Sequence, residues 1–297
     1  MQNQDTATFS GSAGSPGKRQ DTVLIAVFVV VALVSGWIGV LVDRILPEQV
    51  GEESLGMGLW LVLPFLCGVI IRALRRDWAD FGLRPRLRGN MLWYALSILI
   101  FPAVTLVFVI IGQLFGVVSF SPGSISSIVS VFGALFIGLI IKNVFEDFAW
   151  QGFLMPKLVS VKAGDVWIYL IVGLVWAFWH APYYLYFLPD TYYSTPFGRL
   201  LDVFVRSPIV ITIWAVVFVE MTRITRSVWP AVLMHTIEDA VPNVLIFDEG
   251  IITFHGAGDI LLNPLSGVLP LAVFLAFGLW LRTKRIERDA RIGLNTT

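Results

Sequence analysis

The chain has 297 residues, of which 57% are hydrophobic and only 14% are charged, and its mean hydropathy is +0.79. A soluble globular domain carries about 25% charged residues, so this composition excludes an ordinary soluble protein and indicates a polytopic membrane protein. Lys and Arg together number 21, as do Asp and Glu, so no basic excess suggests a nucleic-acid partner. The single cysteine, Cys67, excludes an internal disulfide and a CxxC zinc site.

The first residues are small, polar and rich in Gly and Ser, which predicts a disordered cytoplasmic tail over 1–21. An apolar run follows at 22–42. This run is longer than the apolar core of a secretory signal peptide, and no small-residue cleavage site follows it. We therefore expect it to be retained as the first membrane span.

A membrane-spanning helix needs about 20 apolar residues. Windows of this kind lie near 22–42, 56–74, 91–117, 129–155, 166–187, 201–221, 228–247 and 262–281. We predict an all-α polytopic membrane protein with about eight transmembrane helices. A helical membrane domain then covers 22–281 and a basic cytoplasmic tail covers 282–297, with no internal repeat and no separate soluble domain.

Basic residues gather at alternate connections between the predicted spans. The connection between the second and third spans holds six arginines from Arg72 to Arg88, and basic residues also follow the fourth, sixth and eighth spans. The intervening connections are acidic or nearly uncharged, as at Glu52 and Glu53. Because cytoplasmic loops carry the excess of Lys and Arg, both termini are predicted to be cytoplasmic. In a bacterium, this multi-pass protein is expected in the plasma (inner) membrane.

Three of the windows carry ionisable side chains that lipid disfavours. The fourth holds Glu146 and Asp147, the fifth holds His180, and the seventh holds His235 and Asp239. On insertion scales, each carboxylate at mid-bilayer costs roughly 2.5–3.5 kcal/mol. A chain keeps such groups where they face a wet cavity, a partner or a reaction.

Counting along the helices places these side chains at similar depths. At about 1.5 Å rise per residue, Glu146 lies about 16 Å from the cytoplasmic end of its helix, and His180 about 22 Å from that end of its own. His235 and Asp239 come out at about 13 and 19 Å. If the three helices are neighbours, the groups share one site in the cytoplasmic half of the membrane.

Helical phase supports this grouping. His235 and Asp239 are four residues apart and share a helix face, and Trp176 stands in the same relation to His180. The two adjacent acids of the fourth window are about 100° apart, so one faces the site and the other serves a neighbouring helix. Interhelical polar contacts, a protease, a proton-coupled transporter and a metal site are the alternatives that these residues leave open.

The same residues form three short motifs in a fixed order. They read EDFAWQ from Glu146, WAFWH ending at His180, and HTIED from His235. This series resembles the CPBP family of intramembrane proteases, the CAAX prenyl protease and bacteriocin-processing (Abi-type) group. The pattern of that family is EExxxR, then FxxxH, then HxxxN or HxxxD. The resemblance covers about 130–245.

Three positions depart from the family pattern. The second glutamate is Asp147, the arginine is Gln151, and the phenylalanine is Trp176. The resemblance assigns the chemistry to the leading glutamate and to the histidine of the second motif, and both are present. Because the arginine is missing, a CAAX-type C-terminal carboxylate is a poor candidate for the substrate.

The resemblance implies an intramembrane endopeptidase that hydrolyses a peptide bond of a membrane-associated substrate. Glu146 is then the general base for water, and His180 holds that water and shuttles its proton. His235, with its tautomer set by Asp239, stabilises the oxyanion. The three departing positions have supporting roles.

We expect no resident metal, because the chain has no HExxH motif. The alternative with the same reaction is a zinc enzyme, with His180, His235 and Glu146 as ligands and one open position. A non-proteolytic regulator or scaffold of other membrane proteins is the alternative from a different class. The expected partners are membrane lipid and a peptide or protein substrate at the membrane.

Overall fold

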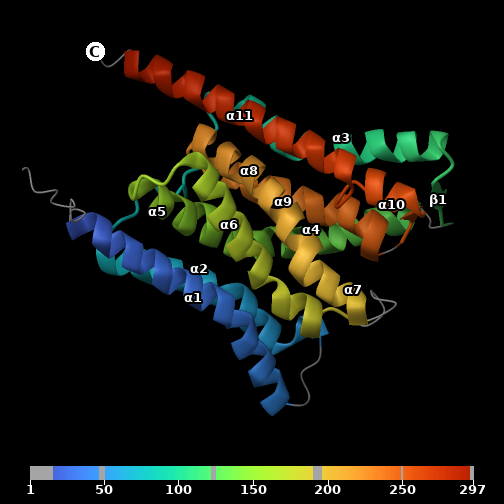
Figure 1. Cartoon of the computed structure of the whole chain (residues 1–297), viewed down its shortest axis with the longest axis horizontal. Helices are drawn as coiled ribbons and strands as arrows, with labels where there is room; N and C mark the ends of the chain where they lie inside the picture. Colours follow the sequence, from blue (N-terminus) through green and yellow to red (C-terminus); the bar gives the residue numbers. More distant parts are fainter. Residues whose placement is uncertain (1–15, 47–50, 122–124, 190–195, 249, 295–297) are drawn as a thin grey trace, which may run out of the picture.

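The computed structural model describes residues 16–46, 51–121, 125–189, 196–248 and 250–294 (Figure 1). Nearly all of this part of the chain is helical, as predicted. Apart from the connections, it also contains a small antiparallel sheet, in which β1 (Val118–Phe120) pairs with β2 (Ile252–Phe254) and Ser119 lies opposite Thr253. Of the predicted N-terminal tail, residues 1–15 lie outside the described ranges, and from Pro16 onward the chain is already helical.

The helices run back and forth through an elongated bundle. In chain order they are α1 (Pro16–Ile45), η1 (Gly51–Glu53), α2 (Leu55–Arg75), α3 (Met91–Leu114), α4 (Ile125–Asp147), α5 (Met155–Ser160), α6 (Asp165–Trp179), α7 (Pro196–Leu201), α8 (Ser207–Thr225), α9 (Trp229–Glu238), α10 (Ala257–Leu262) and α11 (Val268–Leu294). Within the described ranges, four π-helical segments extend them: η2 (Phe148–Leu154) joins α4 to α5, η3 (Tyr183–Phe187) follows α6, η5 (Asp202–Arg206) precedes α8, and η6 (Asp239–Asp248) continues α9.

Five helical stretches within the described ranges are long and apolar enough to cross a membrane. They are Gln20–Ile45, Leu55–Arg75, Met91–Leu114, Asp165–Phe187 and Gly198–Thr225. They coincide with the first, second, third, fifth and sixth predicted windows, which confirms a polytopic membrane protein. The other three windows contain α4 with η2, α9 with η6, and α11, and their passage through the membrane stays a prediction.

The middle of the bundle contains α4, α6, α8 and α9, between the α1–α2 hairpin on one side and α3 with α11 on the other (Figure 1). The hairpin closes tightly because Gly39 and Gly56 let the two backbones meet: a Cβ on Gly39 would lie 2.2 Å from the carbonyl oxygen of Gly56. Trp60 of α2 stacks on Trp179 of α6 with 3.9 Å between ring centroids, and its Nε1 donates to the Trp179 carbonyl at 2.8 Å. The hairpin thereby holds the end of α6 that carries His180.

Both described termini, the start of α1 and the end of α11, lie at one end of the bundle, which we call the basic end (Figure 1). The connection between α2 and α3 folds under this end and is fastened by Arg72, whose Nη1 donates to Asp80 Oδ1 at 2.6 Å and whose Nη2 donates to the Gly152 carbonyl at 2.7 Å. Lys157 donates to Asp77 Oδ2 at 2.6 Å, and this bond lowers the pKa of the Asp77 carboxyl. The opposite end, where α2 and α11 begin and the two strands pair, is the far end.

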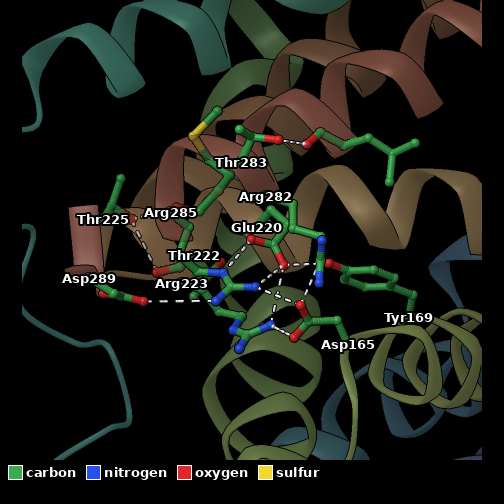
Figure 2. A network of polar contacts seen from close by, with 12 residues as sticks. Asp165, Tyr169, Glu220, Thr222, Arg223, Thr225, Arg282, Thr283, Arg285 and Asp289 are labelled. Carbon is green, nitrogen blue, oxygen red and sulfur yellow. Dashed lines mark hydrogen bonds and ion pairs between the residues drawn. The ribbon is translucent and has the colours of Figure 1, made fainter. Parts of the chain in front are cut away.

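A network of ion pairs joins α6, α8 and α11 at the basic end (Figure 2). Asp165 accepts from Arg223 at 2.7 Å, from Arg282 at 2.7 Å and from Arg285 at 2.9 Å. Glu220 is fully buried and accepts from Arg285 Nε at 2.6 Å. Two carboxylates thus share three guanidinium groups, so that each buried charge is paired.

Replacing Arg285 by methionine should lower the free energy of unfolding by about 3 kcal/mol, because Glu220 keeps its buried charge and loses its shorter ion pair, at 2.6 Å. The midpoint of thermal unfolding in detergent measures this change. Lys284→Met is the matched control, since the Lys284 side chain is 38% exposed and pairs with an exposed acid. That control should shift the free energy by no more than about 0.5 kcal/mol. Equal losses in both variants would contradict a structural role for the network.

Candidate active site

The two adjacent acids, Glu146 and Asp147, form the last residues of α4 and are almost completely buried, at 1% and 0% exposed. The helix then widens into the π-helical segment η2, a geometry that recurs at functional sites. The acids point to different helices: Glu146 contacts α6 and Asp147 contacts α9. One acid therefore serves each neighbouring helix.

Glu146 meets the second motif on α6. Trp176 Nε1 donates to Glu146 Oε1 at 2.5 Å, and His180 Nε2 lies 3.8 Å from the same oxygen. His180 Nδ1 is 2.9 Å from the carbonyl oxygen of Trp176. Because a carbonyl only accepts, Nδ1 carries the proton and Nε2 presents its lone pair toward Glu146. Trp176 thus hydrogen-bonds directly to Glu146. The sequence spacing of Trp176 and His180 predicted that they share a helix face, but it did not predict this bond.

His235 lies between α4 and α8. Its Nδ1 is 3.3 Å from Asp147 Oδ2, and its ring packs edge-on against Trp176 and Phe218, with centroids 5.5 and 5.6 Å away. A carboxylate accepts, so Asp147 holds the proton of His235 on Nδ1. The expectation that Asp239 sets this tautomer was wrong, because the acid that contacts Nδ1 of the imidazole is Asp147, the second acid of α4.

Asp239 is held instead by two side chains one helical turn before the acids of α4. Lys142 Nζ lies 3.0 Å from Asp239 Oδ2, and Asn143 Nδ2 donates to the same oxygen at 2.7 Å. Lys142 Nζ is also 3.7 Å from Glu146 Oε2, so one ammonium lies between the two carboxylates. Sequence analysis missed Lys142, although a lysine four residues before Glu146 in an apolar window was the available signal.

Residues 128–241 match the family described as Rce1-like, type II CAAX prenyl endopeptidase Rce1-like. The chain carries an Rce1-like domain. All three motifs fall inside the matched segment, so the resemblance inferred from them is confirmed. No curated protein matches the chain. The five apolar helices and the Rce1-like domain, whose family is a protease family, support an integral membrane protein.

A cavity of about 910 Å³ reaches the site of the Rce1-like domain. Its lining includes Lys142, His180, His235 and Asp239. Glu146 is not exposed to the cavity, but it contacts two lining residues, His180 and Lys142. A volume of this size accommodates a peptide segment of a few residues rather than a single ion.

The Rce1-like domain departs from the motif pattern at Gln151, and the structure shows the consequence. Gln151 is fully buried in η2, and neither amide atom has a hydrogen-bond partner within the described ranges. Within the described ranges its side chain makes no hydrogen bond to Glu146 or Asp147, so it does not replace the missing cation. The cation at this site is Lys142.

Replacing Gln151 by methionine should stabilise the protein by about 1 kcal/mol, since an unpaired buried amide costs about 1–3 kcal/mol and methionine has a similar volume. Proteolytic turnover should stay within about twofold of the parent, because no catalytic contact is lost. Thermal unfolding and peptide cleavage test the two parts. Gln151→Glu is the matched comparison and should destabilise, because it buries an unpaired charge. A lower unfolding midpoint in Gln151→Met would show that the amide is bonded.

Within the described ranges, one group of ligand-type side chains comes close enough to share an ion. Its ligand atoms lie within 4.8 Å of one another, and its members are His235, Glu238 and Asp239. This is not the set predicted for zinc. Lys142 already neutralises Asp239 at 3.0 Å, and an ammonium repels a metal cation placed beside it. The donor set therefore does not fit a resident metal ion.

Proposed function

We propose that the chain is an intramembrane endopeptidase that hydrolyses a peptide bond of a membrane-associated polypeptide, with Glu146 as general base. One observation carries this proposal: Glu146, His180, His235 and the Lys142–Asp239 pair come from three helices and meet beside one cavity. An acid, two imidazoles and an ammonium supply the proton acceptor and the hydrogen-bond donors that amide hydrolysis needs.

In the proposed first step, water binds between His180 Nε2 and Glu146. The 3.8 Å between these two atoms lets one water molecule contact both. Glu146 accepts a proton from this water while the oxygen attacks the carbonyl carbon of the scissile bond. The resulting tetrahedral intermediate carries a negative oxygen.

In the proposed mechanism His235 acts as an imidazolium: its Nδ1–H donates to Asp147, and its Nε2–H donates to that oxygen together with the Lys142 ammonium. Asp239 keeps Lys142 in place, and Asp147 keeps the His235 ring in place. When the C–N bond breaks, Glu146 returns its proton to the leaving nitrogen. Water and one peptide bond thus become one carboxylic acid and one amine, and transfer of the acid proton between them gives a carboxylate and an ammonium group.

We further propose eight passes through the membrane with both termini in the cytoplasm, and the plasma membrane as the location in a bacterium. The arrangement of charge supports this orientation. The arginine-rich connection after α2, the connection after α8 and the end of α11 all lie at the basic end, together with both described termini.

Hydrolysis is tested with the purified chain in liposomes that also contain membrane-anchored peptides with randomised sequences. New peptide ends are identified by mass spectrometry in water labelled with heavy oxygen. We expect the label in each new carboxyl group, because water supplies the oxygen. If none of the peptides yields new ends, the result would favour a non-proteolytic regulator and contradict the proposal.

Removal of metal should leave this activity unchanged. We expect cleavage rates before and after treatment with EDTA to agree, since the Lys142 ammonium already supplies a positive group at the site. Elemental analysis of the purified protein provides a second readout. Loss of activity with the chelator, restored by zinc, would instead support the zinc enzyme.

A further inference from the structure

The cavity at the proposed active site continues toward the far end of the bundle. Beyond the polar cluster, its lining is contributed by residues of the far-end connections and the first turns next to them. These are Glu53, Ser54, Leu188, Gly198, Phe247 and Ser266. They belong to four separate connections, which lie at the far end of the bundle (Figure 1). The cavity lining thus reaches the turns of the chain at this end.

The basic end contributes no lining residue within the described ranges. At this end the connection between α2 and α3 covers the site. Phe81 from this connection packs with Phe148, Val228 and Val232 in a separate apolar cluster, and the Arg72 side chain fills the space between Asp80 and the Gly152 carbonyl. Trp229 Nε1 donates to the Leu83 carbonyl at 2.6 Å and fastens the connection to α9.

We infer that a polypeptide substrate reaches the catalytic cavity from the far end, which is the membrane face opposite the basic loops. This inference rests on the proposed function and names the side from which its substrate comes. With the basic end in the cytoplasm, the scissile segment is delivered from outside the cytoplasm. A cytoplasmic peptide would have to displace the packed connection and its hydrogen bonds.

The mouth of the cavity fits a neutral or basic peptide segment. The lining contains four carboxylates, Glu53, Asp202, Glu238 and Asp239, and two cationic side chains, Lys142 and Arg206. Arg206 pairs with Asp202 at 2.9 Å, and Lys142 pairs with Asp239. With both cations paired, the exposed carboxylate of Glu53 meets an incoming peptide at the mouth, which disfavours an acidic segment.

Three glycines offer matched probes of access. Gly58 and Gly138 line the cavity and are exposed, and a Cβ at either position would meet no atom within 4 Å. Gly138 lies two helical turns before Glu146, about 12 Å from it along α4. Gly164 at the basic end is also exposed, with open space for a Cβ. Because Cys67 is the one cysteine, Cys67→Ala gives a background for single-cysteine variants.

The experiment uses sealed vesicles in which a C-terminal epitope is either exposed or enclosed, and a membrane-impermeant maleimide. Gly58→Cys and Gly138→Cys should react when the epitope is enclosed and should not react when it is exposed. Gly164→Cys should show the reverse pattern. Labelling of both cavity positions from the epitope side, or only after detergent, would overturn the inference.

A second readout connects access to catalysis. A bulky maleimide on Gly138→Cys should abolish peptide cleavage, whereas the same reagent on Gly164→Cys should leave it unchanged. The labelling pattern does not need activity, so it separates the two proposals: a chain that is labelled as expected but never cleaves refutes the proposed function alone. Cleavage that persists in fully labelled Gly138→Cys would overturn this route for the substrate.

Discussion

Peptide hydrolysis should fall by at least about 10³-fold when Glu146 is replaced by glutamine, the range expected for loss of a general base. Glutamine has the same shape, and its amide oxygen can still accept from Trp176 Nε1, now 2.5 Å from the carboxylate. It cannot accept a proton from water near pH 7. The change should therefore act on the chemical step and leave the packing of α4 against α6 intact.

Single-turnover cleavage in liposomes measures this loss, and the thermal unfolding midpoint checks that the fold persists. Glu287→Gln makes the same chemical change on an exposed face of α11 and should keep full activity. If Glu146→Gln retains more than about a tenth of the parent rate, another group accepts the proton.

Replacing Lys142 by methionine should lower kcat by about 10²–10³-fold, the loss typical of one missing oxyanion donor. Methionine keeps most of the apolar stem but removes the ammonium, which lies 3.0 Å from Asp239 and 3.7 Å from Glu146. The two carboxylates then face each other without a cation, and the oxyanion loses a donor. KM should change little, because the effect belongs to the transition state.

The combined variant Lys142→Met with Asp239→Asn separates a catalytic role from a structural one. It removes the cation and its nearer carboxylate together, so Asp239 is not left as a charge without a cation, and an asparagine amide offers a new donor. We expect it to recover at least about tenfold in kcat over Lys142→Met alone. Equal inactivity of both variants, with unfolding midpoints restored to the parent value, would show that the ammonium itself is not replaceable.

The local sequence contained enough to group Glu146, His180 and His235. Depth along a helix follows from a fixed rise per residue, so three windows could be compared before their packing was known. The order of the motifs then indicated the protease family, which the match over residues 128–241 confirms. The grouping by depth and the order of the motifs both depend on spacing along the sequence, which the geometry of a single helix converts into distance.

The pairing of side chains did not follow in the same way. Whether Asp147 or Asp239 meets His235 depends on how far α4 and α9 are rotated about their axes, and neighbouring helices set that rotation. For the same reason Lys142 was overlooked: its spacing from Glu146 was visible, but its contact with Asp239 crosses from α4 to α9.

Membrane character, the three polar windows and the family motifs were thus determined by composition, periodicity and residue order. The tautomer partner of His235, the ammonium between two carboxylates and the end at which the cavity opens were decided by tertiary packing. Counting residues along a helix gives the depth of a side chain in the membrane. It does not show which end of the bundle is closed by neighbouring segments. Here the connection after α2 packs Phe81 and Arg72 under the basic end, and the cavity is left open at the other.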